Sequence, residues 1–291
     1  MYQKLENERK KEQVILSGNQ EFYILGCQFI ECSANGNGGG ICISSSVFSL
    51  IHLCTFDSCQ STGSSYGGTV YVKGKNSNIT KSSFIRSKGY LGSACYQEVL
   101  EYPILFDTTL YSCKGYRHTS GQLSEFSETK RVNGSYLVGT EESCSVHNWN
   151  AKDLDYSFLT YFYCKSKNVH DLHSQKQAVT SYVCVINCSE STYQIGVGYG
   201  PHTLEDSTLI SPISPFGRFI NLNGKAVVRN CFFSITPSVT YVTTENCKVV
   251  QSVPNLKHMC YLPNISHDFS MNDLSGLFNY ILICTIYIMS G

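Results

Sequence analysis

The chain has 291 residues, of which 15% are charged, and its formal net charge at pH 7 is zero. This length supplies enough apolar residues for one elongated solenoid or two ordinary domains. The neutral balance gives no basic surface of the kind that nucleic-acid binding requires, so we expect no nucleic-acid partner.

Residues 1–20 begin with a run in which Lys and Arg alternate with Glu, from Met1 to Gln13. The apolar stretch Val14-Ile15-Leu16 that follows is too short for the central region of a secretory signal peptide. The chain is therefore either cytosolic or a fragment without its natural start. We predict that residues 1–20 form a short charged cap, helical or frayed, at the end of the next domain.

The stretch from residue 26 to residue 121 contains four copies of one pattern. Each copy has an apolar residue in a short run flanked by Cys, Ser or Thr, and the first two copies continue into a pair of glycines. The repeated positions are Phe29, Phe56, Phe84 and Leu110, spaced by 27, 28 and 26 residues, with glycine pairs at Gly38-Gly39 and Gly67-Gly68. A fixed period of this size indicates one structural unit stacked on copies of itself.

Each unit consists of short apolar, β-branched runs separated by Gly, Ser and Asn, which is typical of strands and turns. About 27 residues suffice for one turn that returns about 4.8 Å above its start. We therefore predict an all-β fold, a right-handed parallel β-helix, over residues 21–270, with clear repeats at 26–121 and degenerate ones afterwards. The phenylalanines should stack inward, and the glycine pairs should form tight corners.

This alternation of Phe-x-x-Asn/Cys with Gly-Gly-Ala-Ile is similar to the repeats of polymorphic outer-membrane proteins. It also resembles the Cys-rich β-helix surface proteins of parasitic protists, because Cys32, Cys59 and Ser87 replace the Asn of the bacterial repeat. The resemblance covers about a third of the chain. It implies a pectin-lyase-like solenoid at the cell surface or secreted, with host or extracellular glycans or proteins as partners.

The fifteen cysteines include no Cys-x-x-Cys pair, so their spacing argues against a zinc site. We predict neither a metal nor a cofactor. Equivalent residues of stacked turns lie close enough for disulfides, which would join Cys27 to Cys54 and Cys32 to Cys59. Alternatively, these cysteines are small buried side chains that fill an interior ladder.

Four Asn-x-Ser/Thr sequons occur, at Asn78, Asn133, Asn187 and Asn264. Such sequons are glycosylated only in proteins that pass through the secretory pathway. Together with the cysteines, they favour an extracellular location.

Two groups of polar residues are candidates for a metal or catalytic site. His170 and His173 are three residues apart and have no obvious third ligand, and Glu141, Glu142, Asp153 and Asp155 are close in sequence. We expect both groups to lie in solvated loops. Aligning the repeats sets Asp57 against Ile30 and Ile85, so no column of acidic residues forms. A polysaccharide lyase or hydrolase would need such a column.

We therefore expect no catalytic residue and a non-catalytic surface or adhesion protein. A polysaccharide lyase or glycoside hydrolase of β-helix type is the alternative, and a truncated, non-functional member of a repeat family is a third interpretation.

The C-terminal segment, residues 271–291, is apolar almost throughout from Leu277 to Met289. It is shorter than the roughly 20 apolar residues that span a bilayer. A buried terminal segment and the start of a truncated membrane anchor both remain open, and the second would associate the protein with a membrane.

Overall fold

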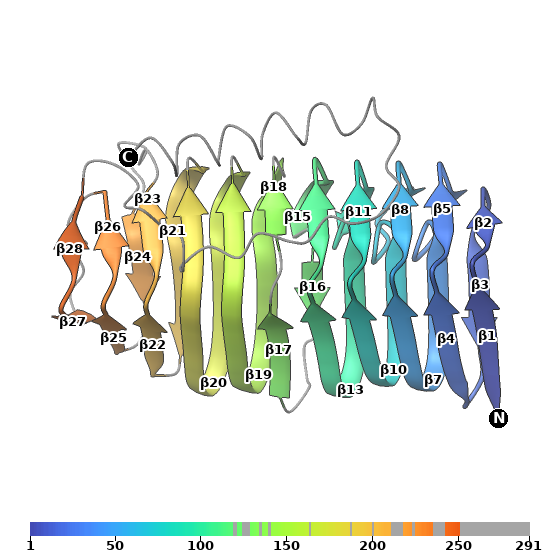
Figure 1. Ribbon diagram of the computed structural model, residues 1–291, viewed down its shortest axis with the longest axis horizontal. Coiled ribbons are helices and arrows are strands. Elements are labelled where there is room, and N and C mark those ends of the chain that lie inside the picture. Colours follow the sequence, from blue (N-terminus) through green and yellow to red (C-terminus); the bar gives the residue numbers. More distant parts are fainter. Residues whose placement is uncertain are drawn as a thin grey trace.

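The computed structural model describes residues 1–118, 121–123, 129–133, 136–138, 141–162, 164–186, 188–199, 201–210, 218–222, 225–234 and 242–250. Every regular element in these ranges is a β-strand, and the strands pair in parallel to form successive turns of one stack (Figure 1). The predicted all-β parallel β-helix is therefore confirmed.

The strands of the N-terminal turns are β1 (Tyr2–Glu6), β2 (Arg9–Lys10), β3 (Val14–Ser17), β4 (Glu21–Leu25), β5 (Gln28–Ile30), β6 (Ser33–Ala34), β7 (Ile41–His52), β8 (Thr55–Asp57), β9 (Gln60–Ser61), β10 (Val70–Thr80), β11 (Ser83–Ile85), β12 (Lys88–Leu91), β13 (Cys95–Phe106), β14 (Thr109–Tyr111), β15 (Lys114–His118) and β16 (Gly121–Leu123).

The strands of the later turns are β17 (Thr129–Asn133), β18 (Tyr136–Val138), β19 (Glu141–Phe162), β20 (Lys165–Ile186), β21 (Ser189–Tyr199), β22 (His202–Glu205), β23 (Thr208–Ile210), β24 (Arg218–Leu222), β25 (Ala226–Arg229), β26 (Phe232–Phe233), β27 (Val242–Glu245) and β28 (Lys248–Val249).

The predicted phenylalanine column forms the centre of the core. Phe29 stacks on Phe56 with ring centroids 4.9 Å apart, and Phe56 stacks on Phe84 at the same distance. Leu110 pairs with Phe84 in the next turn, and all four side chains are fully buried. No single turn could enclose these side chains, so stacking of the turns creates the core.

The column continues beyond residue 121, where the sequence repeat is no longer clear. The residues in register after Leu110 are Leu137, Tyr161, Val185, Leu209 and Phe233. From Leu137 onward the step along the chain is 24 residues instead of 26 to 28. The second half is thus a regular continuation with shorter turns, whose period differs from the one that the sequence predicts.

Residues 1–20 contain strands and no helix, so the expectation of a helical or frayed cap is wrong. β1 pairs with β4, β2 with β5 and β3 with β7, which makes this segment the first turn of the β-helix. Its side chains are mostly exposed and include the ion pair Lys4–Glu6. Charged side chains on a terminal strand disfavour edge-to-edge association with other chains, which explains how this polar sequence fits a strand.

The glycine pairs form corners, as predicted. Gly38 and Gly67 have φ values of 66° and 63°, and the Gly38 amide donates to the Gly67 carbonyl at 2.8 Å. At Gly39 an added Cβ would overlap the carbonyl of Gln60, and at Gly68 it would overlap that of Lys88. The corner therefore requires glycine at two successive positions. The first glycine has a left-handed backbone, and the second leaves room for the backbone of the neighbouring turn.

Two further corners consist of a single residue with positive φ. One column of such corners is Asn7, Gly26, Leu53, Lys81, Asp107, Phe158, Tyr182, Asp206, Asn230 and Asn246, and the other is Glu31, Ser58, Arg86 and Ser112. The next residue is buried in each case where its side chain is described, except for the partly buried Glu8 and Cys247. At many corners it is Cys or Ser, which donates to the carbonyl two residues earlier, as Ser82 does to Thr80 at 2.9 Å and Cys54 to His52 at 3.4 Å.

Candidate functional site

The cysteines of the predicted ladder occupy these inward corner positions. Cys27 and Cys54 lie on neighbouring turns, as do Cys32 and Cys59, and all four have buried, free thiols in the structure. Cys and Ser both occur at equivalent positions, because either side chain is small and can donate a hydrogen bond to the carbonyl two residues earlier. The structure thus places these residues as an interior ladder of thiols and hydroxyls.

Each thiol pair shares a hydrogen bond that separates the pKa values of its two members. The hydrogen bond with Cys54 lowers the pKa of Cys27 to about 7, against the opposing effect of burial. The same hydrogen bond, together with burial, raises the pKa of Cys54 well above its usual range. Cys32 and Cys59 repeat this arrangement, with the pKa of Cys32 lowered and that of Cys59 raised.

The sequons fall on different parts of the molecule. Asn78 lies in β10 and is half-buried, between the buried residues Ser77 and Ile79. Asn133 ends β17. Asn187 and Asn264 lie outside the described residues. Residues 251–270, the last part of the predicted β-helix, and residues 271–291, the predicted C-terminal segment, also lie outside them.

The two expected polar loops are strands, so those predictions are wrong. His170 and His173 lie within β20, and Glu141, Glu142, Asp153 and Asp155 are spread along β19. Both strands have 22 residues. Each runs without interruption through the positions at which a loop was expected. The predicted alignment of Asp57 with Ile30 and Ile85 is confirmed by the strand register.

A groove on the outer surface follows the corner that contains Ser58, Arg86 and Ser112. It consists of two adjoining hollows of about 480 and 460 Å³, which share Lys88 and Lys114. One hollow is lined by Ser61, Gly63, Lys88, Gly89, Tyr90, Lys114 and Gly115, and the other by Glu31, Ser58, Gln60, Arg86, Lys88, Ser112 and Lys114.

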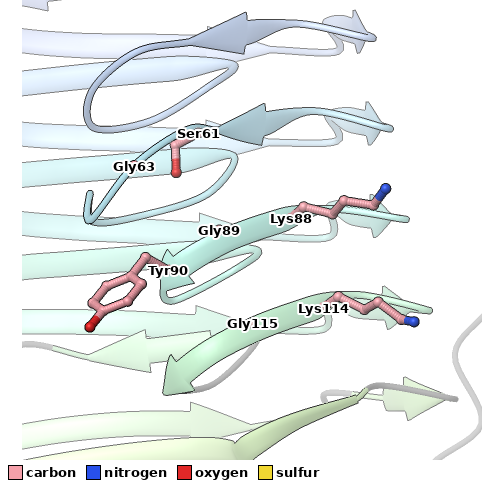
Figure 2. A pocket seen from close by; sticks show the side chains of 7 residues that line it. All are labelled: Ser61, Gly63, Lys88, Gly89, Tyr90, Lys114 and Gly115. Atoms are coloured by element: carbon pink, nitrogen blue, oxygen red, sulfur yellow. The ribbon is translucent and has the colours of Figure 1, made fainter.

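The groove crosses the turns rather than following one of them. β9, β12 and β15 contribute successive rungs of its floor, with Gln60, Lys88 and Lys114 in register. Figure 2 shows the side chains of Lys88 and Lys114 extending in the same direction from neighbouring rungs, while Tyr90 projects from the other end of β12. Gly89 and Gly115 are also in register, and at Gly89 an added Cβ would overlap the backbone of Gly68, so the turns pack closely beside the lysines.

The charges of the groove are unequal. Arg86 binds both carboxylate oxygens of Asp57 across the turn, each at 2.6 Å, so this pair is internally neutralised. Lys88 and Lys114 add two positive charges in register, and Glu141 follows Lys114 in register on the next turn. Glu31 is the single carboxylate among the described residues of the lining.

The sequence analysis missed these residues although the repeat contains the signal for them. Lys88 and Lys114 each lie four residues after a core anchor, Phe84 and Leu110, as Gln60 does after Phe56. These two lysines therefore form one column in the repeat. The column faces outward and does not contribute to the core, so the Phe, Cys and Gly periodicity does not reveal it.

Among the described residues, no group of three or more His, Cys, Asp or Glu side chains could hold a metal ion. The same part of the chain has no helix long and apolar enough to cross a membrane. The comparisons with known protein families, curated proteins and solved structures find no match for this chain.

Proposed function

We propose that this chain is a non-catalytic surface or adhesion-type protein that presents an elongated face to glycans or proteins. The observation that carries the proposal is the register of Lys88 and Lys114, which line one groove on neighbouring turns. Neighbouring rungs lie about 4.8 Å apart, so successive groups of an extended ligand chain can each meet a rung.

The chemistry of the groove favours acidic ligand groups. A carboxylate or sulfate beside the two lysines would accept hydrogen bonds from both ammonium groups. Tyr90 adds an aromatic face and a hydroxyl at the same hollow. An acidic polysaccharide, or an acidic extended segment of a protein, therefore suits the groove best.

The lining supports binding more than hydrolysis. Glycosidases generally use two carboxyl groups on opposite sides of the scissile bond, whereas Glu31 is the single carboxylate among the described residues that line the groove. This supports the non-catalytic interpretation over a glycoside hydrolase.

The location follows from the proposed family. We propose a secreted or cell-surface protein related to the Cys-rich β-helix proteins of parasitic protists, on the basis of the Phe and Gly-Gly repeat. Residues 271–291 would then form part of a membrane anchor.

The test is binding of the full chain to immobilised polygalacturonate, with neutral dextran as the reference surface. The double variant Lys88→Ser, Lys114→Ser should bind at least about ten-fold more weakly, as expected when two partly exposed ion pairs are lost. The matched control is Lys73→Ser, Lys75→Ser, which removes the same charge from exposed lysines on β10 that pair with Glu98 and Glu101.

Retained binding in the control and weaker binding in the groove variant would support the proposal. Equal loss in both variants would mean a diffuse electrostatic effect and would contradict the groove. Release of new reducing ends or unsaturated products, absent from heat-treated protein, would favour the enzyme interpretation instead.

A further inference from the structure

The two hollows of the groove differ in chemistry. The hollow of about 480 Å³, called the glycine hollow below, is lined by three glycines and by Ser61. The hollow of about 460 Å³, called the charged hollow below, is lined by Glu31 and Arg86 instead. Lys88 and Lys114 belong to both linings. One ligand can therefore meet two different surfaces that share these lysines.

One end of the glycine hollow is uncharged. Figure 2 shows Lys88 and Lys114 extending away from the end at which Ser61 and Tyr90 lie. Among the described residues that line this hollow, none is acidic, and the two lysines are the only charged ones. The end near Ser61 and Tyr90 therefore suits uncharged ligand groups.

Ser61 has an unpaired hydroxyl at this uncharged end. Its side chain lines the hollow and is only 8% exposed, and its Oγ has no hydrogen-bond partner among the described residues. The Oγ lies against the next rung, because a Cβ added to Gly89 would come within 3.3 Å of it. A buried hydroxyl without a partner costs free energy, and a ligand hydroxyl that pairs with it offsets this cost.

We infer that the glycine hollow binds a neutral sugar residue linked to the acidic residue held by Lys88 and Lys114, with Ser61 hydrogen-bonded to one of its hydroxyls. The ligand is then a glycan in which each acidic residue has a neutral neighbour, rather than a polyuronate. The inference rests on the proposed glycan binding and names the sugar sequence that the groove selects. The Ser61 oxygen is covered, so it reaches the ligand by rotating about χ1 to another staggered position.

The selection against a second acidic residue follows from the cost of desolvating a charge. A carboxylate at the Ser61 end of the hollow would lose water without gaining a cationic partner from the described lining. A neutral hydroxyl at the same place gains the hydrogen bond to Ser61 and leaves no charge unpaired. The neutral residue is therefore the better occupant.

The experiment is isothermal titration calorimetry of the full chain with two oligosaccharides that carry the same number of carboxylates. Hyaluronan hexasaccharide alternates glucuronate with the neutral N-acetylglucosamine, whereas trigalacturonate is acidic throughout. We expect the dissociation constant of hyaluronan hexasaccharide to be at least about ten-fold lower, because it alone places a neutral sugar in the glycine hollow.

Ser61→Ala tests the hydrogen bond. Ala34 is in register with Ser61 one turn earlier, so the stack accepts alanine at this position, and the melting temperature should not fall. The variant should lose about three- to ten-fold of the preference for hyaluronan hexasaccharide over trigalacturonate, as expected for one neutral hydrogen bond. Ser33→Ala is the matched control, because Ser33 is exposed and belongs to neither lining, and it should retain the full preference.

The outcomes separate this subsite from the groove. Equal affinities for the two oligosaccharides, or the full preference in Ser61→Ala, would overturn the neutral subsite and leave the acidic groove in place. If the wild-type protein bound neither oligosaccharide more than neutral dextran, the groove and the subsite would both be wrong. A preference that falls in Ser61→Ala and persists in Ser33→Ala would support the subsite.

Discussion

The rings of Phe56 and Phe84 lie face to face with 4.9 Å between their centroids and 7° between their planes, although the residues are 28 positions apart in the chain. This stack belongs to the interior column that starts at Phe29. Neighbouring turns pack on each other through this column, so substitutions in it should change the stability of the β-helix directly.

Truncation of Phe56 should weaken the β-helix strongly. Phe56→Ala removes a fully buried ring between two others and should lower the free energy of unfolding by about 3–5 kcal/mol, measured by urea denaturation. Leu100→Ala is the control, because Leu100 is 67% exposed and its truncation should cost less than about 0.5 kcal/mol. Similar effects of the two substitutions would contradict the interior stack.

The corner at Gly39 should accept no side chain. Gly39→Ala sets a Cβ against the carbonyl of Gln60 and should destabilise the protein by about 1–3 kcal/mol through overpacking. The Cβ of Gly36→Ala meets no atom within 4 Å, so this substitution three residues away should be nearly neutral. Comparison of the two melting temperatures provides the test, and equal values would show that the turns do not approach closely at this corner.

Gln97 should be replaceable by an apolar residue with a gain in stability. It is fully buried in β13, and neither polar atom of its side-chain amide has a hydrogen-bond partner in the structure as described. Gln97→Leu has a similar shape and should raise the free energy of unfolding by about 1–3 kcal/mol. Gln97→Glu, which buries a charge, should lower it. A stabilising Glu would indicate a cationic or donor partner that the described residues do not include.

The thiol pairs should differ in reactivity in a way that depends on pH. The lowered pKa of Cys27 gives it more thiolate than Cys54, whose pKa is raised, so iodoacetamide should modify Cys27 first as the pH rises through about 7. The same order should hold for Cys32 over Cys59. Mass spectrometry after brief labelling of the folded protein measures both ratios.

Substitution of each partner supplies the control for this order. Cys54→Ala removes the hydrogen bond to Cys27 and should slow Cys27 without changing Cys32, while Cys59→Ala should do the reverse. If both variants slowed or accelerated both cysteines together, opening of the N-terminal turns would explain the reactivity instead of the pKa difference.

The first part of the fold could be predicted from sequence because its determinants are few and periodic. Phe29, Phe56 and Phe84 are identical residues at nearly constant spacing, and Gly39 and Gly68 are required at a corner that no other residue fits. These constraints appear in the sequence as a repeat. The left-handed corners leave a weaker signal, because residues as different as Glu31 and Arg86 occupy them.

The second part could not be predicted in the same way. Its core column contains Tyr161, Val185 and Leu209, which fill equivalent interior positions with unlike shapes. The turn shortens to 24 residues, so an alignment with a period of 27 places these residues out of register. The stacked pair Phe158–Tyr182 follows this shorter step, so a period of 27 does not align its two residues.

Lysine acetylation in the presence and absence of polygalacturonate tests the proposed groove most directly. We predict that the polymer protects Lys88 and Lys114 from the reagent, while Lys73 and Lys75, which are exposed on β10, react at the same rate with and without it. Uniform protection of all four lysines, or protection of Lys73 and Lys75 with Lys88 and Lys114 still reactive, would contradict the groove as the binding site.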